Sequence, residues 1–305
     1  MHLEGIHHIT MITGDAPGNV DFYTRVLGLR MVAKTVNQDD PTVYHLFYAD
    51  ENGSPGTEMT FFEYPGARPG RAGAGMVHTL ISRVGSETAL DFWAERLAAE
   101  GIATERDGNR LRFADPEGLG HELAVDAGAE LHAAEHPQIP AEFALGGLIG
   151  VRAYSIDEDG SRRVLEDVLG ATAQAPSTWE LRGSERAATI TFERAPAAGI
   201  PGAGTVHHVA WASTIEEHEA WRDKVIDGGG QPTPVIDRFY FKSIYFREPS
   251  GVLFEIATLG PGFAVDEAPD ALGEALRLPP QYEDLRERLE SELADVPNPR
   301  SGART

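Results

Sequence analysis

Hydrophobic and polar positions along this chain change their period in the same way four times. Four segments, which begin at Gly5, Gly75, Gly147 and Gly204, each open with alternating apolar and polar residues and continue with apolar residues at helical spacing. The predicted helices end at or near a glycine, a residue that readily takes the left-handed conformation at a helix C-terminus. A repeat at this scale indicates one small structural unit that is present in four copies.

Short alternating runs follow the predicted helices and complete the unit. Such runs are typical of strands that bury one face. Each unit is therefore predicted to be β-α-β-β-β, and the chain to be an α+β protein of four βαβββ modules. The runs cover residues 42–48, 58–62, 110–113, 122–125, 189–192, 243–246 and 252–257.

The modules are expected to form two domains. The stretch 130–140, which contains Pro137 and Pro140, has the composition of a linker. We therefore predict a first domain at residues 1–135, with modules one and two, and a second at residues 145–262, with modules three and four.

Residues 263–305 form a separate tail in this division. Four apolar residues of the tail share one helical face, which predicts a helix that docks on the body of the protein. A lid or a dimer arm is the alternative, and the residues after Pro297 are expected to be disordered. The apolar face consists of Tyr282, Leu285, Leu289 and Leu293.

The composition excludes several classes of function. The chain has 305 residues, 41% of them hydrophobic and 24% charged, which is typical of a soluble globular protein. A formal net charge of −22 argues against nucleic acid or an anionic membrane surface as a partner. The sequence has no cysteine, so disulfides, cysteine-ligated metals and thiol nucleophiles are excluded. No apolar run approaches the roughly 18 residues of a membrane span, and we expect a cytoplasmic protein.

One short sequence phrase occurs twice. The runs GIHHITM at residues 5–11 and TVHHVAW at residues 205–211 each place two adjacent histidines at the start of an apolar stretch. A glutamate, Glu255, lies within a third apolar stretch. Two histidines and one carboxylate on rigid strands make the facial triad that binds non-heme Fe(II) and leaves coordination positions open. The chain is therefore expected to be a metalloenzyme rather than a binding module.

A single histidine on an apolar strand is more often structural than metal-binding, but two aligned pairs and a strand glutamate favour a metal site. Successive side chains of a strand point to opposite faces, so only one histidine of each pair can face the metal directly. Module two also has a histidine, His78, and a closing glutamate, Glu122. Module three has the run GVR at residues 150–152 where a second histidine would be needed. Modules two and three are therefore predicted to be a structural pair without a metal.

Four such modules, with a histidine on a first strand and a glutamate on a last strand, resemble the vicinal oxygen chelate superfamily, which includes glyoxalase I, methylmalonyl-CoA epimerase, fosfomycin-resistance proteins and extradiol dioxygenases. Within it, the chain is most similar to the hydroquinone and chlorohydroquinone 1,2-dioxygenases, and the resemblance covers nearly the whole chain. The motifs that carry this closer resemblance are IHHIT at 6–10, YHLFYAD at 44–50, GSPGT at 53–57, VHH at 206–208, RFYFKSIY at 238–245, PSGVLFE at 249–255 and LPPQY at 278–282.

This resemblance implies an extradiol-type ring-cleaving dioxygenase, an oxidoreductase of EC class 1.13.11, with the vicinal oxygen chelate fold. Such an enzyme opens a hydroquinone with O2 to a maleylacetate-type product, as in aromatic degradation. The resemblance implies that the metal is Fe(II), bound by His8, His208 and Glu255. Mn(II) stays open as the metal because the same ligands serve both ions.

The resemblance also suggests further site residues. His7 and His207 would lie beside the ligands and could transfer protons near neutral pH. Arg238 could hold the distal hydroxyl of the substrate, and Tyr245 could orient the substrate by hydrogen bonding. A surface salt bridge for Arg238 and strand packing for Tyr245 are the alternatives. Thr10 lies on the same strand face as His8 and is expected to contact the pocket.

Two other functions stay open at this point. A glyoxalase-like or epimerase-like isomerase or lyase would use a fourth protein ligand and proton transfer without O2. A resistance protein would bind quinones or drugs without turnover. We favour a small aromatic substrate and O2 as partners, together with assembly into a homodimer or a higher homo-oligomer.

Overall fold

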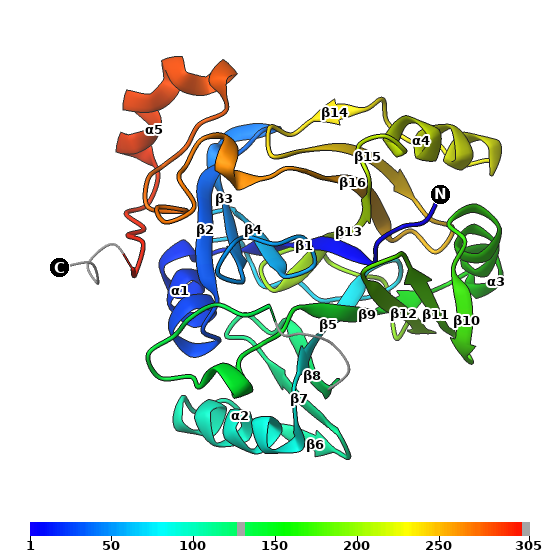
Figure 1. Ribbon diagram of the computed structural model, residues 1–305, viewed down its shortest axis with the longest axis horizontal. Coiled ribbons are helices and arrows are strands. Elements are labelled where there is room, and N and C mark those ends of the chain that lie inside the picture. Colours follow the sequence, from blue (N-terminus) through cyan, green and yellow to red (C-terminus); the bar gives the residue numbers. More distant parts are fainter. Residues whose placement is uncertain (127–131, 301–305) are drawn as a thin grey trace.

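Two mixed sheets of eight strands each form the body of the computed structural model, which describes residues 1–126 and 132–300 (Figure 1). The first sheet has the strand order β14-β15-β16-β13-β1-β4-β3-β2, and the second has the order β10-β11-β12-β9-β5-β8-β7-β6. The predicted α+β class and the four βαβββ modules are confirmed. Residues 130 and 131 of the predicted linker lie outside the described residues.

Each sheet combines one module from each half of the sequence. The first sheet contains β1 (Ile6–Thr13), β2 (Arg30–Asn37), β3 (Asp40–Ala49) and β4 (Glu58–Glu63) of module one, with β13 (Thr205–Ser213), β14 (Ile236–Asp237), β15 (Phe241–Arg247) and β16 (Leu253–Pro261) of module four. The second sheet contains β5 (Val77–Val84), β6 (Glu105–Asp107), β7 (Arg110–Ala114) and β8 (Gly120–Val125) of module two, with β9 (Leu148–Ser155), β10 (Thr172–Ala175), β11 (Thr178–Arg182) and β12 (Ala187–Arg194) of module three.

The first strands of the modules join the two halves. β1 pairs with β13 in the first sheet, and β5 pairs with β9 in the second, both antiparallel. The expectation that modules one and four pack together is confirmed. The division into residues 1–135, 145–262 and 263–305 stays a prediction about domains, because the sheets follow the pairing of modules and not the order of the halves.

Each module has its helix directly after its first strand, and polar side chains cap three of these helices. The Asp15 and Asp157 carboxylates accept hydrogen bonds from the backbone N–H of Gly18 and Gly160, and the Ser86 hydroxyl accepts one from Ala89. In modules one and three the helix continues as a π-helical turn. The helices are α1 (Ala16–Val20) with η1 (Asp21–Val26), α2 (Glu87–Ala99), α3 (Glu158–Arg163) with η3 (Val164–Val168), and α4 (His218–Asp227).

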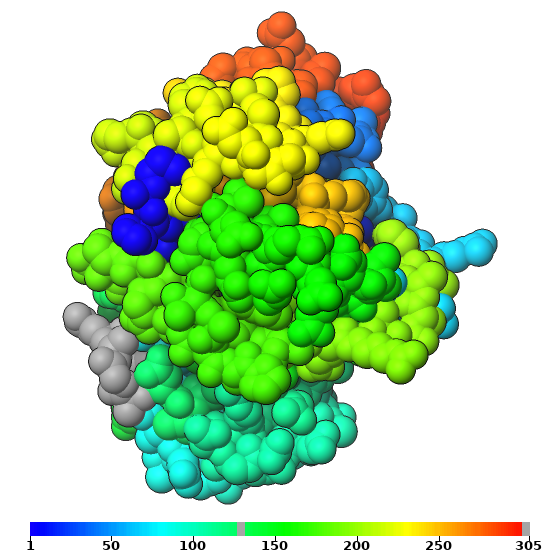
Figure 2. All heavy atoms as spheres, turned by 90° about the vertical axis from the view of Figure 1, so that its right-hand side faces the viewer, coloured from blue at the N-terminus to red at the C-terminus, as the bar shows by residue number. Residues whose placement is uncertain are grey.

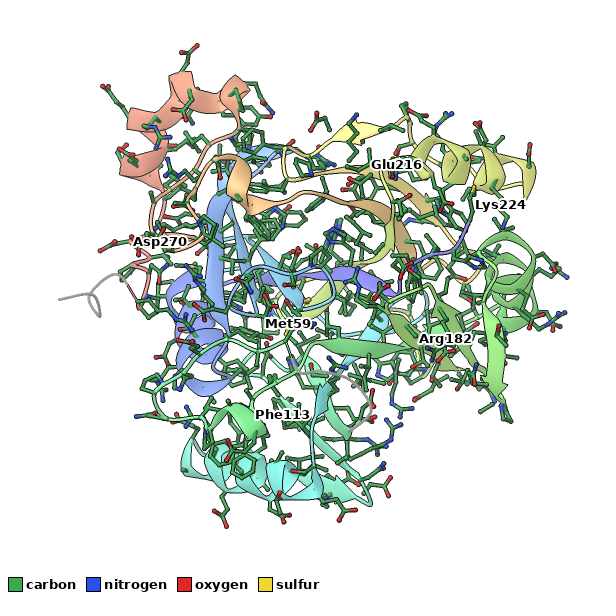
Figure 3. The ribbon with its side chains drawn as sticks, viewed as in Figure 1. Met59, Phe113, Arg182, Glu216, Lys224 and Asp270 are labelled. Carbon is green, nitrogen blue, oxygen red and sulfur yellow. The ribbon has the colours of Figure 1, made fainter. Side chains whose placement is uncertain are left out.

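A single hydrophobic cluster extends through both sheets and holds the modules together. Three fully buried tryptophans contribute to it: Trp93 of α2, Trp211 of β13 and Trp221 of α4. Burial of a large apolar side chain contributes roughly 2–3 kcal/mol. Figure 3 shows the labelled interior residue Met59 between the elements of the body, whereas the labelled and exposed Asp270 lies at the periphery.

The N-terminal segment lies on the surface between modules three and four (dark blue in Figure 2). Its buried Glu4 carboxylate accepts hydrogen bonds from the backbone N–H and hydroxyl of Ser184, at 2.8 and 2.9 Å, and from the N–H of Glu185 at 3.0 Å. The backbone N–H of Glu4 donates to the carbonyl of Ala212 in β13. This segment therefore ties the start of β1 to both neighbouring modules.

The C-terminal tail packs against β2 and β3, the outer strands of module one. It contains the short helical turns η4 (Phe263–Val265) and η5 (Pro280–Leu285), followed by α5 (Arg286–Glu292). A further short turn, η2 (Ala141–Phe143), lies in the connection between modules two and three. Leu289 of α5 is buried against Val36 and Leu278, so the predicted docking of a tail helix on the body is confirmed.

The expectation of disorder directly after Pro297 is wrong for the three residues that follow. Asn298 is buried, and its side-chain amide donates to the carbonyl of Leu272. Arg300 pairs with the Glu51 carboxylate at 2.7 Å. Polar contacts with the body therefore fix the chain as far as Arg300, and residues 301–305 lie outside the described residues.

A buried polar group connects modules one and two. The Tyr23 hydroxyl, in η1, lies 3.0 Å from Asp115 Oδ2 and 3.1 Å from His121 Nε2, and the His121 ring stacks on Phe113. Burial lowers the pKa of His121 to about 3 and raises the pKa of Asp115 to about 6. Both side chains are therefore held in their neutral forms over a wider pH range than in the unfolded chain.

The pKa shifts of His121 and Asp115 make the stability of the protein depend on pH in opposite directions. The unfolded chain protonates His121 below about pH 6.5, whereas the native protein does so only near pH 3. The stability that neutral His121 provides is thus lost as the pH falls through this window. The contribution of Asp115 is present at low pH and lost as the pH rises through about 6.

We predict that a His121→Gln substitution removes the first of these dependences. The stability difference between the original protein and the variant should shrink by up to about 1.4 kcal/mol for each pH unit below 6.5. Urea unfolding between pH 7 and pH 4 measures this difference, and His2→Gln, at an exposed histidine, is the control. A difference that stays constant across this range would contradict the assignment of a buried neutral histidine.

Candidate metal centre

Three adjacent strands bring the predicted ligands together. His8 of β1 lies opposite Ala210 of β13, which in turn lies opposite Glu255 of β16. His208 precedes Ala210 by two residues and therefore points to the same face of the sheet. The register of β1, β13 and β16 thus places two imidazoles and one carboxylate on one face, at the centre of the first sheet.

The three side chains converge on one point in the interior. Glu255 Oε2 lies 2.8 Å from His208 Nε2 and 3.3 Å from His8 Nε2, and the two Nε2 atoms are 3.2 Å apart. All three residues are at most 4% exposed. Glu255 Oε2 is buried without a hydrogen bond, although burial of an unpaired carboxylate oxygen is costly. A divalent cation bound between these atoms would satisfy all three, so the residues fit a metal.

The protonation states of these residues also suit metal binding. Burial opposes ionisation of Glu255, but the neighbouring His8 and His208 outweigh this effect and hold the pKa of Glu255 well below its ordinary value. Burial lowers the pKa of His208, although Glu255 partly opposes the shift. The site therefore combines an ionised carboxylate with a neutral imidazole that has a free lone pair. The Ser243 hydroxyl donates to Glu255 Oε1 at 2.5 Å and fixes the carboxylate.

The first histidine of each pair orients the second. His7 Nε2 lies 3.0 Å from the Thr258 carbonyl oxygen, which can only accept, so this nitrogen carries a proton. In a neutral His7 the Nδ1 atom is then an acceptor for His8 Nδ1, 3.0 Å away. This leaves the lone pair of His8 on Nε2, directed at Glu255. A register shift between Ile6 and His8 in β1 brings the two rings close enough for this contact.

The second histidine pair, His207 and His208, makes the same contact between Nδ1 atoms beside the cavity. His207 Nδ1 lies 2.8 Å from His208 Nδ1, so His208 can take the same tautomer as His8. Unlike His7, His207 is exposed. The pair thus connects a buried candidate ligand to a ring that solvent can reach.

A second group of possible ligands shares His8. Glu58 of β4 is buried opposite His8, and its Oε2 lies 3.9 Å from His7 Nδ1 without a hydrogen bond. Together these three residues could also hold a cation. This group is less suited to a metal, because His7 Nδ1 and His8 Nδ1 are already bonded to each other. Burial raises the pKa of Glu58 well above its ordinary value, which favours a neutral carboxylic acid.

A cavity of about 320 Å³ lies beside His8 and His208. Aromatic side chains, among them Phe47, Phe62 and Phe241, form part of its walls. The Phe241 ring centroid is 5.0 Å from those of both His7 and His8. A concave, partly open space with apolar walls beside convergent polar groups is typical of a small-molecule site.

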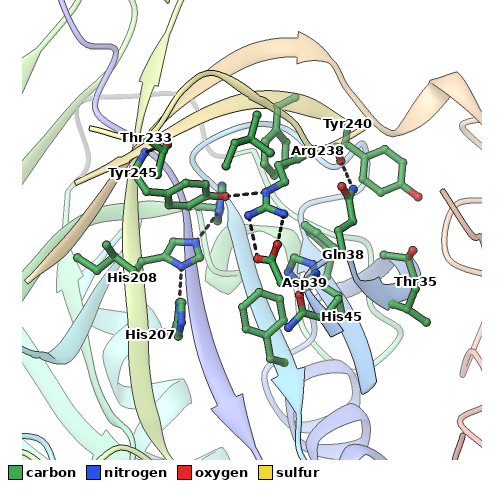
Figure 4. A pocket seen from close by; sticks show the side chains of 18 residues that line it. Thr35, Gln38, Asp39, His45, His207, His208, Thr233, Arg238, Tyr240 and Tyr245 are labelled. Carbon is green, nitrogen blue, oxygen red and sulfur yellow. Dashed lines mark hydrogen bonds and ion pairs between the residues drawn. The ribbon is translucent and has the colours of Figure 1, made fainter. Parts of the chain in front are cut away.

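Arg238 and Tyr245 line the cavity on the side of His208 (Figure 4). The Arg238 Nε donates to the Tyr245 hydroxyl at 3.2 Å, and the Tyr245 ring centroid is 5.7 Å from that of His208. Burial raises the pKa of Tyr245, so the hydroxyl keeps its proton. Arg238 also forms a salt bridge with Asp39 at 2.9 Å.

Thr10 is fully buried and reaches the cavity only through other residues. Its hydroxyl lies 2.7 Å from the Thr60 hydroxyl, which lies 3.0 Å from His45 Nε2. His45 lines the cavity, so Thr10 is two hydrogen bonds away from it. A role for Thr10 in catalysis stays a prediction.

Among the residues at this site that were not anticipated from the sequence, three bear on its charge and hydrogen bonding. They are Asp39 and Gln38, which line the cavity, and Glu58, which lies beside His7 and His8. None belongs to a repeated phrase, and each meets its partner only through the pairing of distant strands. No local signal in the sequence could have identified them.

The corresponding position of the second sheet has a different environment. Ile81 lies opposite Glu122 there, as Ala210 lies opposite Glu255, which puts Thr79 in the place of His208. Three arginines contact the Glu122 carboxylate: Arg110, Arg112 at 2.9 Å and Arg152 at 3.2 Å. In the described part of the chain, both groups able to hold a cation lie in the first sheet. Guanidinium groups thus neutralise the carboxylate of the second sheet.

Comparison with known proteins shows the family. The chain matches the model of the Glyoxalase/Bleomycin resistance protein/Dioxygenase superfamily over residues 5–123 and 154–256, and it belongs to this superfamily. No helix in the described residues has the length and apolar character to cross a membrane.

Individual relatives indicate which class of enzyme within the superfamily this chain resembles. MhqA of Bacillus subtilis, provisionally named a ring-cleaving dioxygenase, is 38% identical over 97% of this chain and 100% of its own length. The chlorohydroquinone/hydroquinone 1,2-dioxygenase of Sphingobium indicum is 31% identical over 94% of this chain and 95% of its own length. The crystal structure of a provisionally named dioxygenase from B. subtilis has a TM-score of 0.91 at 38% identity and covers 97% of this chain and 98% of that one. These relatives support a dioxygenase activity.

The geometry predicts that a metal ion binds to the Glu255 carboxylate and not to that of Glu58. A ligand that binds only the native state raises stability, so anaerobic addition of Fe(II) or Mn(II) to metal-free protein should raise the midpoint of thermal unfolding by roughly 5–10 °C. Glu255→Gln should remove most of this shift, and the matched variant Glu58→Gln should keep it. The reverse result would assign the metal to the group of His7, His8 and Glu58.

Proposed function

We propose that this protein is an Fe(II)-dependent ring-cleaving dioxygenase that opens a hydroquinone with O2 to a maleylacetate-type product. The observation that carries the proposal is the convergence of His8, His208 and Glu255 beside a small cavity with aromatic side chains in its walls. The relative from Sphingobium indicum, which is named for activity on hydroquinones, supports this substrate class.

In this proposal His8, His208 and Glu255 bind the metal. When bound, Fe(II) supplies the electronic coupling that lets O2 react with an aromatic ring, with both oxygen atoms entering the product. Three protein ligands leave positions for substrate and O2. The glyoxalase-like alternative calls for a fourth protein ligand, and the group of possible ligands at this point has three members among the described residues.

The cavity suits one aromatic ring. A space of about 150 Å³ accommodates benzene in an engineered protein, and this cavity has about 320 Å³. A hydroquinone with one or two small substituents therefore fits, together with O2. Phe62 and Phe241 offer ring edges and faces for contact with an aromatic substrate.

Tyr245 and Arg238 would orient the substrate. The Tyr245 hydroxyl accepts a hydrogen bond from Arg238 Nε, so its own proton is free to be donated to a substrate oxygen. Burial of Tyr245 raises its pKa and keeps this donor protonated. A guanidinium behind a tyrosine hydroxyl also stabilises negative charge that develops on the bonded oxygen.

The two outer histidines have different roles in this proposal. His7 is buried between Thr258 and His8 and would act by orienting His8. His207 is exposed at the cavity and hydrogen-bonded to His208. Desolvation of its ring beside His208 lowers its pKa to about 3, so it would stay neutral and act as a hydrogen-bond partner of the substrate. Assembly into a homodimer and a cytoplasmic location stay predictions.

Oxygen uptake tests the proposal. Protein loaded anaerobically with Fe(II) should consume one O2 for each hydroquinone or methylhydroquinone, and each product should be heavier than its substrate by two oxygen atoms. His208→Ala should reduce the rate at least about 100-fold, because a ligand is lost. Binding of one metal without O2 uptake on any hydroquinone or catechol would instead favour an isomerase or a lyase.

A further inference from the structure

The cavity contains one permanent cation and one carboxylate among the lining residues that the structure describes. These are Arg238 and Asp39, and they are bonded to each other. Both oxygens of Asp39 accept hydrogen bonds from the guanidinium, with Nη1 to Oδ1 at 3.0 Å and Nη2 to Oδ2 at 2.9 Å (Figure 4). This two-point geometry is the strongest form of a carboxylate–arginine contact.

The turn that carries Asp39 is attached on two sides. Asp39 lies between β2 and β3, and the side-chain amide of the preceding Gln38 donates to the carbonyl of Arg238 at 2.8 Å. On the other side, the Tyr282 hydroxyl of the C-terminal tail donates to the Gln38 carbonyl at 2.6 Å. These two hydrogen bonds hold the turn between the tail and the segment of Arg238. They therefore keep Asp39 in position for its salt bridge with Arg238.

The segment of Arg238 is fixed as well. The next residue, Phe239, has φ = +73°, a conformation that a bulky side chain rarely adopts. Its backbone N–H donates to the Asp237 carboxylate at 2.8 Å, which helps to hold this turn. The side chain of Arg238 is 16% exposed, whereas that of Asp39 is 72% exposed, so the pair lies at the mouth of the cavity. The guanidinium thus has one preferred position, between Tyr245 and Asp39.

Asp39 offsets part of the positive charge that Arg238 presents to a ligand. All three guanidinium nitrogens already donate a hydrogen bond, Nε to Tyr245 and the two Nη atoms to the oxygens of Asp39. The other lining residues are aromatic, aliphatic or uncharged polar side chains and histidines. An uncharged ligand meets no penalty here, whereas an anionic group near Arg238 would also approach the Asp39 carboxylate.

We propose that Asp39 is a specificity-determining residue that makes the cavity select uncharged aromatic alcohols and reject aromatic carboxylates. The inference rests on the proposed function in so far as the ligands are para-substituted phenols. It goes beyond that function by naming the residue that separates hydroquinones from hydroxylated aromatic acids, and by giving the C-terminal tail a part in holding that residue.

Two matched phenols test the inference. 4-Hydroxybenzoate and 4-hydroxybenzamide have nearly the same shape, and only the first carries a charge at neutral pH. Their affinities for Fe(II)-loaded protein are measured by calorimetry without O2, so turnover is not needed. We expect the original protein to bind the amide more tightly, and Asp39→Asn to bind the carboxylate about tenfold more tightly than before with little change for the amide.

The neighbouring Asp40 provides the control. It follows Asp39 as the first residue of β3, its side chain accepts hydrogen bonds from Thr42, and it does not line the cavity. Asp40→Asn removes the same charge from the same surface and should leave both affinities unchanged. In the double variant Asp39→Asn with Arg238→Gln, the gained affinity for 4-hydroxybenzoate should be lost again.

Three results would overturn the inference. The first is equal affinity of the original protein for both phenols. The second is an equal gain in affinity for 4-hydroxybenzoate in Asp39→Asn and in Asp40→Asn. The third is an equal loss of affinity for both phenols in Asp39→Asn. These outcomes are independent of the O2 reaction. Protein that discriminates between the phenols but consumes no O2 would contradict the proposed dioxygenase and leave the role of Asp39 intact.

Discussion

The antiparallel pairing of β1 with β13 is the constraint on which the candidate centre depends. It joins strands about 200 residues apart in the sequence and sets His8 and His208 within 3.2 Å of each other. The parallel pairing of β13 with β16 then adds Glu255 on the same face. No single module has these three groups. A metal site at this position therefore requires that modules one and four share a sheet.

This arrangement also explains why so many polar groups can be buried in one place. The Thr258 carbonyl fixes the tautomer of His7, which in turn fixes that of His8. Ser243 holds one oxygen of Glu255 and leaves the other facing the imidazoles. The second sheet has the same topology, but arginines surround its glutamate. One fold thus supports either a cation-binding group or a salt-bridged one, depending on a few side chains.

The repeats and the candidate ligands could be predicted from the sequence because they recur at matching positions. The phrase with two histidines is local, and the alternation of strand faces limits which ring can face inward. β2 was not anticipated, since the tail covers its outer face and seven of its eight residues are buried without alternation. β10 was missed for the opposite reason, because all four of its residues are exposed.

The rest of the site depends on contacts that no local pattern encodes. Asp39 meets Arg238 across 199 positions of the sequence, and Glu58 faces His7 only because β4 runs beside β1. The resemblance to ring-cleaving dioxygenases pointed to Arg238 and Tyr245, and both line the cavity. Their neighbours, which set the charge and the shape of that cavity, emerge only from the packing of the turn between β2 and β3 against module four.

The most direct test of this account is a crystal structure of protein loaded anaerobically with Fe(II), with anomalous scattering recorded at the iron edge. The account predicts one peak per chain, about 2.1 Å from His8 Nε2, His208 Nε2 and Glu255 Oε2. A peak between His7 and Glu58, or a peak in the second sheet, would contradict the assignment of the centre to β1, β13 and β16.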